Sequence, residues 1–234
     1  MLAVYSFAIP AGAGIGFMLG AIILIGVGGD MTEEERIDKE IWRWSLRVTP
    51  WLGFIAVILI VMLLEEPERG RSEGGHNLRI TSMKKDIKYL LANKAFVLDT
   101  LGFSCVAFVL GALAWWSPLF ISLGVKVQAD TGNVPGDIVP IIFGAVSMAA
   151  GLMGVPLGSY IGQKLRVKYP KADPLVCGFG LAIALPILLA TIFLAEHNTL
   201  ASLILCFIGQ LFQNLSWAIV IDIMLLYTSA SQRK

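Results

Sequence analysis

Residues 175–195, LVCGFGLAIALPILLATIFLA, contain no charged side chain. A helix needs about 20 mostly apolar residues to cross the hydrocarbon core of a bilayer. Because lipid offers no water to backbone N–H and C=O groups, such a stretch is expected to be helical. Five further windows are also long and mostly apolar: 3–29, 46–64, 95–123, 139–162 and 200–228. The sequence therefore predicts an all-α polytopic membrane protein with six transmembrane helices.

Basic residues are distributed unequally over the two sides of this predicted bundle. Of the 18 Lys and Arg residues, 13 lie in the connections 65–94 and 163–174 and at the C-terminus. The other side carries the remaining 5: Arg36, Lys39, Arg43, Arg47 and Lys126. Because cytoplasmic loops are enriched in Lys and Arg, both basic connections and both termini are predicted to be cytoplasmic. No Arg or Lys is expected within a span, so a phosphate substrate would need its counter-charge from helices outside this chain.

Composition and motifs favour neither an enzyme nor a nucleic-acid-binding protein. The net charge is +1, and the basic residues follow the loops instead of forming a phosphate-binding patch. The three cysteines, Cys105, Cys177 and Cys206, lie in apolar windows without CxxC spacing. GxSxG, HExxH and GxxxxGK[ST] motifs are absent from the sequence. We therefore expect no enzymatic activity, cofactor, metal site or nucleic-acid partner.

The connection 65–94 changes character along its length. Its first part is polar and glycine-rich, whereas residues 82–94 alternate lysines with an apolar face and begin at Ser82, a plausible N-cap. This pattern predicts a short amphipathic helix, either packed beneath the bundle as a linker or lying in the inner membrane interface.

Glycines four residues apart recur in two of the windows. They are Gly12, Gly16 and Gly20 in the first window, and Gly154, Gly158 and Gly162 in the fourth. Such spacing lets two helix backbones approach closely in lipid. Simple packing explains it; a second interpretation is that these faces slide past a neighbour during transport.

The last window contains most of the intramembrane polar residues. At 100° per residue, Gln210, Gln213, Asn214 and Trp217 share one face. Polar residues in spans usually face a bundle interior, so this face is predicted to form one wall of a water-accessible cavity. The alternative is hydrogen bonding between helices. Asp222 lies about 120° from Gln210, which favours a helix–helix contact or an inner gate.

Small residues line one face of the third window throughout its depth. They are Thr100, Ser104, Ala107, Gly111, Ala114 and Pro118. Their face predicts either helix packing or a shallow groove for a lipid tail, in which Thr100, Ser104 and Gly111 would contact the substrate.

Several short stretches, in order along nearly the whole chain, carry a resemblance to a known family. They are FAIPAGAGIG (7–16), WSLRVTP (44–50), EP (66–67), LGF (101–103), VAFV (106–109), WSP (116–118), KADPLVC (171–177) and WAIV (217–220). Together they resemble the Spinster family of the major facilitator superfamily. Residues 158–168 also resemble the loop motif of that superfamily: Gly158 and Arg166 match, whereas Gly162 and Leu165 replace its Asp and second Gly. Gln210 stands where relatives tend to have an acid.

The resemblance implies a major facilitator fold with twelve helices in two halves. The six spans would be the fifth to the tenth, so that this chain is a fragment of the fold. Residues 1–64 would hold the last two helices of the N-terminal half, 65–94 the cytoplasmic connection, and 95–234 the first four helices of the C-terminal half.

The same resemblance implies a secondary active transporter that exports lysolipids or sphingoid phosphate lipids by alternating access. Membrane lipids, a small amphiphilic or polar substrate and protons would be its partners. Its location would be the late endosome, the lysosome or the plasma membrane. Two alternatives stay open: a transporter of sugars or other small polar solutes, and a truncated isoform that transports nothing.

Overall fold

The computed structural model describes residues 2–29, 31, 35, 39–64, 83–127, 138–169 and 172–232. Residues 65–82, which form most of the predicted connection, lie outside this set. The described residues form eight helices: α1 (Leu2–Gly28), α3 (Trp42–Leu63), α4 (Met83–Ala92), α5 (Lys94–Val127), α6 (Val139–Arg166), α7 (Ala172–Leu194), α8 (Thr199–Asn214) and α9 (Ser216–Gln232). The prediction of an all-helical protein is confirmed.

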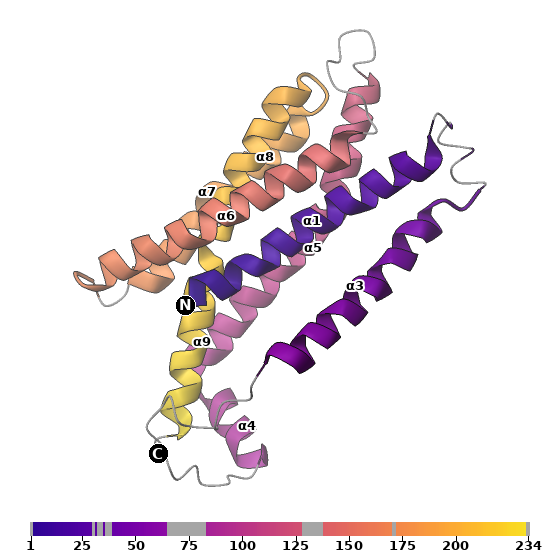
Figure 1. Cartoon of the computed structure of the whole chain (residues 1–234). Coiled ribbons are helices and arrows are strands. Elements are labelled where there is room, and N and C mark those ends of the chain that lie inside the picture. The colour runs from indigo at the N-terminus through magenta and orange to yellow at the C-terminus, as the bar shows by residue number, and fades with distance from the viewer. Residues whose placement is uncertain are drawn as a thin grey trace.

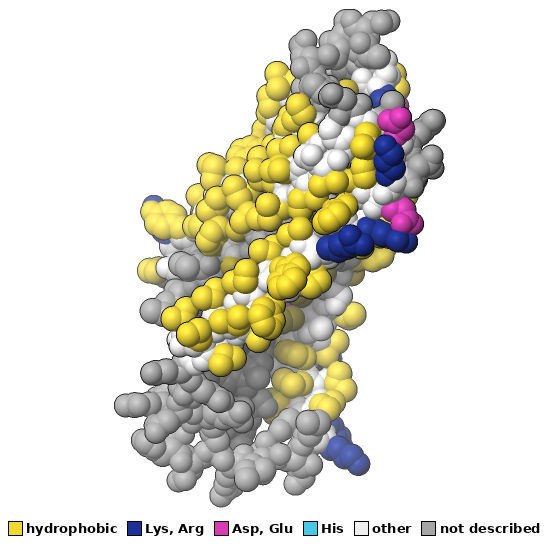
Figure 2. Space-filling view, turned by 45° about the vertical axis from the view of Figure 1, so that its right-hand side comes forward, with side chains coloured by type: hydrophobic (Ala, Val, Ile, Leu, Met, Phe, Trp, Pro, Cys, Tyr) yellow, Lys and Arg dark blue, Asp and Glu magenta, His cyan; other side chains and the backbone are white. Residues whose placement is uncertain are grey.

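Six stretches within the described residues are long and apolar enough to cross a membrane, which confirms the predicted number. Five are α1, α3, α5, α6 and α7, and the sixth is Thr199–Met224, formed by α8 and the start of α9. Their outer surfaces carry many exposed large hydrophobic side chains. Figure 2 shows such side chains covering much of one described face, with Lys and Arg at its margins, as expected for a surface that meets lipid.

Successive membrane-spanning stretches run in opposite directions through the bundle (Figure 1). The closest neighbours are α1 with α6, α6 with α8, and α7 with α8. By contrast, α3 lies at the periphery beside α1 and has no buried residue. Helix α6 therefore lies at the centre of the packed part of the bundle.

The predicted glycine packing is present on α6. A Cβ at Gly158 would overlap the backbone carbonyl oxygen of Leu215, and one at Gly154 would lie 2.7 Å from the carbonyl oxygen of Leu211. Gly162 is in looser contact with the side chain of Ile219, at 3.2 Å. This glycine face therefore allows α6 to contact the backbone of α8 at the point where that helix ends.

The first helix uses a different glycine from those predicted. A Cβ at Gly12, Gly16 or Gly20 would meet no described atom within 4 Å. The close approach to α6 is made by Gly14, where a Cβ would lie 2.6 Å from the carbonyl oxygen of Gly144. Gly14 is half a turn away from the other three glycines, whose contact with a neighbouring helix stays a prediction.

The last predicted window is not one continuous helix, and this prediction is corrected: α8 ends at Asn214 and α9 begins at Ser216. At the break, the Ser216 hydroxyl donates to the backbone carbonyl of Gln213 (3.0 Å). The amide of Leu215 donates to Phe212, three residues back, at 3.4 Å. Polar side chains that bond local carbonyls compete with the regular helical pattern, which explains the break.

Two further details concern the helix ends. The predicted amphipathic helix is confirmed as α4, which packs against α5 and α9. The expectation that spans contain no Arg or Lys is corrected: Lys94, Lys126, Lys164 and Arg166 lie in the end turns of α5 and α6, and Arg43 and Arg47 lie in the first turns of α3. Their guanidinium carbons lie 5.5 and 5.0 Å from the ring centroids of Trp42 and Trp44. Such cation–π contacts are suited to the membrane interface.

Candidate functional site

A cavity of about 250 Å³ lies between α6 and the helices packed around it. Residues from six helices, α1, α5, α6, α7, α8 and α9, contribute to its wall. The lining residues are Ile9, Pro10, Ala13, Phe17, Leu110, Gly111, Leu113, Ala114, Ser117, Phe143, Ser147, Leu188, Cys206, Gln210, Gln213, Asn214 and Trp217. None of these lining residues is charged, and the wall contributed by α1 consists of apolar side chains only.

The polar part of the wall comes mainly from the end of α8. Gln210, Gln213, Asn214 and Trp217 line the cavity together, as the sequence predicts, and Gly111 of α5 also lines it. The break at Leu215 follows directly after Gln213 and Asn214, so an irregular piece of backbone lies beside the cavity. Trp217 packs edge-on against Phe103 of α5, with ring centroids 5.3 Å apart.

Hydrogen bonds within α8 hold two of these amides. The Gln210 side-chain nitrogen donates to the Cys206 sulfur (3.2 Å), and the Asn214 side-chain nitrogen donates to the backbone carbonyl of Gln210 (2.8 Å). Gln213 differs: it is 2% exposed, and its side-chain oxygen has no hydrogen-bond partner in the described part of the chain. The site therefore contains one buried acceptor that is not satisfied locally.

Thr100 and Ser104 do not join the other predicted substrate-binding residues. Their hydroxyls donate to the backbone carbonyls four residues earlier, both at 2.8 Å, and neither side chain lines the cavity. Of the predicted small-residue stripe, Gly111 and Ala114 reach the wall. Further along α5, Ser117 also lines the cavity, although its position in the sequence does not predict this.

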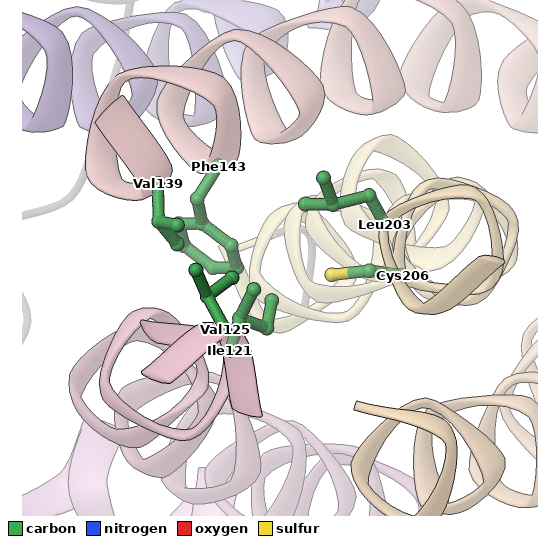
Figure 3. Close-up of a cluster of buried hydrophobic side chains, with 6 residues drawn as sticks. All are labelled: Ile121, Val125, Val139, Phe143, Leu203 and Cys206. Atoms are coloured by element: carbon green, nitrogen blue, oxygen red, sulfur yellow. The ribbon is translucent and has the colours of Figure 1, made fainter. Parts of the chain in front are cut away.

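A cluster of buried apolar side chains lies at one end of the cavity (Figure 3). It combines the last turns of α5, the first turns of α6 and the first half of α8: Ile121, Val125, Val139, Phe143, Leu203 and Cys206. Phe143 and Cys206 belong to both the cluster and the cavity wall. Phe17 of α1 packs edge-on against Phe143, with centroids 5.4 Å apart. The side chains of three helices are thus packed together on the side assigned to the exterior.

An ion-pair network lies at the opposite end. Arg166, at the end of α6, pairs with Asp173 of α7 (2.8 Å) and with Asp222 of α9 (2.6 Å). Its Nε also donates to Asp173, at 3.3 Å. The loop motif lacks its usual Asp at Gly162, but Asp173 and Asp222 supply two carboxylates to the arginine. Arg166 therefore connects three helices at the predicted cytoplasmic end.

Sequence comparisons place this arrangement among known proteins. The family model described as Major Facilitator Superfamily matches residues 1–234. The chain is 48% identical over 233 residues to "Protein spinster" of Drosophila melanogaster, covering 100% of this chain and 36% of that protein. It is 39% identical to "Protein spinster homolog 3" of Danio rerio and to "Protein spinster homolog 1" of Mus musculus, covering 45% and 43% of them.

The chain thus spans less than half the length of these curated relatives. Its match to them nevertheless extends over its whole length, and both comparisons agree with the six apolar spans of the structure. The chain belongs to the major facilitator superfamily, and the resemblance to its Spinster family is confirmed.

Proposed function

We propose that this chain supplies one wall of the central cavity of a secondary active transporter that exports single-chain amphiphilic lipids, such as lysolipids or sphingoid phosphates. Membership of the major facilitator superfamily supports transport across a membrane. The observation that carries the choice of substrate is the uneven polarity of the cavity, apolar along α1 and amide-rich at the end of α8.

An amphiphile matches this uneven wall. Ile9 and Phe17 of α1 and Leu110 and Leu113 of α5 offer apolar surface to a hydrocarbon chain. The Gln210–Asn214 segment offers amide groups to a polar head. A sugar presents hydroxyls in all directions, and those facing α1 would lose their hydrogen bonds to water without replacement. The cavity therefore favours the lipid over the sugar alternative.

No basic residue lines the cavity in the described part of the chain. If the head group is a phosphate, its counter-charge would be supplied by the other helices of a complete transporter. A coupling proton would likewise need a carboxylate outside this wall, since Gln210 carries an amide that cannot take part in proton transfer at neutral pH.

Alternating access requires that two halves rock about a site near the bilayer midplane. If residues 1–64 and 95–234 belong to different halves, the contact of α1 with α6 is the interface between them. That contact is made at Gly14 and Gly144 and by the rings of Phe17 and Phe143. We further propose that both termini lie in the cytoplasm and that the transporter resides in the late endosome, the lysosome or the plasma membrane.

The test is a flux assay with a complete transporter. In the Drosophila relative, the matched segment is replaced by this chain, and the chimera is reconstituted into liposomes. Saturable transport of labelled lysophosphatidylcholine, with little transport of labelled glucose, is expected. The 234-residue chain alone is the control and is expected to transport neither, because the remaining helices are needed to enclose the cavity. Glucose transport without lipid transport would contradict the proposal.

A further inference from the structure

The unpartnered side-chain oxygen of Gln213 is the strongest sign of a ligand contact in the described part of the chain. Gln213 is 98% buried, lines the cavity and has no hydrogen bond to this oxygen. A buried acceptor without a donor costs about 1–3 kcal/mol. Since most buried polar side-chain atoms in proteins are hydrogen-bonded, the atom calls for a donor. Because the oxygen has almost no surface open to the cavity, the side chain must turn toward the cavity to meet a donor that enters it.

The polar neighbours do not supply that donor. The side-chain nitrogens of Gln210 and Asn214 donate to other groups within α8. The hydroxyl of Ser216 donates to the backbone carbonyl of Gln213, not to its side chain. The donors nearest in sequence thus bond other groups, and one of them, the Ser216 hydroxyl, holds the Gln213 backbone at the end of α8.

We infer that the side-chain oxygen of Gln213 accepts a hydrogen bond from a hydroxyl or amine of the ligand. Gln213 would thereby select single-chain amphiphiles that carry a donor next to the chain over those that lack one. This inference rests on the proposed function and adds to it one residue, Gln213, that recognises the head group of the lipid. An amide oxygen is neutral, so it accepts from a hydroxyl without requiring the ligand to be charged.

Burial makes the selection strong enough to measure. A donor-bearing ligand exchanges its bond to water for a bond to Gln213, whereas a ligand without a donor leaves the buried oxygen unpaired. Discrimination of this kind depends on the unsatisfied partner more than on the bond itself. A bound water is the competing explanation: it would satisfy the oxygen whichever ligand is present, and selectivity would then be absent.

The test uses a lipid pair that differs in one hydrogen-bond donor. Lysophosphatidylcholine has a free 2-hydroxyl, and its phosphate and quaternary ammonium donate no hydrogen bond. Its 2-O-methyl ether therefore lacks any donor in the head group. Binding to the 234-residue chain in lipid nanodiscs is followed by the fluorescence of Trp217, which lines the cavity. The five other tryptophans are replaced by Phe: Trp42, Trp44, Trp51, Trp115 and Trp116.

We expect the unsubstituted cavity to prefer the free hydroxyl by roughly tenfold in Kd. Gln213→Met keeps the length of the side chain but removes the acceptor, and it should abolish the preference. Gln213→Glu keeps an acceptor and should retain it. Gln163→Met is the matched control, because Gln163 is exposed on α6 and bonds Ser159 away from the cavity, at 3.2 Å. Circular dichroism verifies the helical content of each variant.

Each outcome separates the two proposals. Equal binding of both lipids to the unsubstituted cavity, or a preference that survives in Gln213→Met, overturns the role of Gln213 and leaves lipid binding intact. If neither lipid changes the fluorescence of a chain with full helical content, this inference fails, whereas the proposed function is decided by lipid flux through the complete chimera.

Discussion

The contact at Gly158 makes the most quantitative prediction for this fold. In Gly158→Ala, the new Cβ would overlap the Leu215 carbonyl oxygen and would lie 2.7 Å from the Leu215 Cα. These are backbone atoms at the break between α8 and α9, so no side-chain rotation relieves the contact. Overpacking in a core costs about 1–3 kcal/mol, and we expect the upper half of that range here.

A matched variant separates the cost of this backbone contact from the change in helix propensity. Gly178→Ala also replaces a helical glycine by alanine, on α7, where a Cβ meets no described atom within 4 Å. Both substitutions gain roughly 0.5–1 kcal/mol of helix propensity, so their difference in unfolding free energy reports packing alone and should be about 2–3 kcal/mol. Unfolding is followed by circular dichroism during SDS titration of mixed micelles. Equal midpoints for the two variants would show that α6 and Leu215 are not in backbone contact, which would refute the packing described above.

Three further predictions concern the ends of the bundle. Arg166→Ala should lower the unfolding free energy by about 1 kcal/mol, because two partly exposed ion pairs, to Asp173 and Asp222, are lost and solvent screens both. Arg166→Lys should recover part of this loss, and additivity of Arg166→Ala with Asp222→Asn in a double-mutant cycle would contradict the ion pair. Phe143→Ala should cost roughly 3 kcal/mol in the same titration by leaving a void in the apolar cluster; a much smaller loss would mean that the ring is not packed. In intact cells, a membrane-impermeant amine reagent should label Lys39 but not Lys84, and the reverse pattern would invert the orientation.

The six-span architecture follows from hydropathy because the bilayer imposes one simple requirement on every span. The helices nevertheless extend beyond several of the apolar windows. Helix α5 runs from Lys94 to Val127 and α6 continues to Arg166, since end turns outside the hydrocarbon can carry charge without cost. The break at Leu215 was missed for a related reason: averaged hydropathy does not register where Ser216 bonds a local carbonyl.

The polar half of the site was predictable, and its apolar half was not. Gln210, Gln213 and Asn214 stand out because amides are rare in an apolar window and are expected to face an interior. Thr100 and Ser104 do not line this cavity, and their hydroxyls bond the preceding turn of their own helix, which a polar residue in an apolar window can do without facing an interior. Residues such as Phe17 carry no signal, since an apolar side chain facing a cavity looks the same in the sequence as one facing lipid.

The end of α8 contributes both to helix packing and to the cavity wall. Asn214 lines the cavity and also packs its Cβ against Gly154, and the next residue, Leu215, contacts Gly158. About two helical turns further toward the predicted cytoplasmic end, Asp222 and Arg166 connect α9 to α6 again.

Helix α6 is therefore joined to α8 and α9 by backbone contacts and by an ion pair, at separate depths. Its contacts with α1 at Gly14 and Phe17 are of another kind, with backbone and ring surfaces that carry no charge. A charged pair with a fixed geometry resists sliding more strongly than apolar surfaces do, because displacement would leave charges unpaired. If these helices rearrange during transport, we expect α6, α8 and α9 to move together and the displacement to occur along α1.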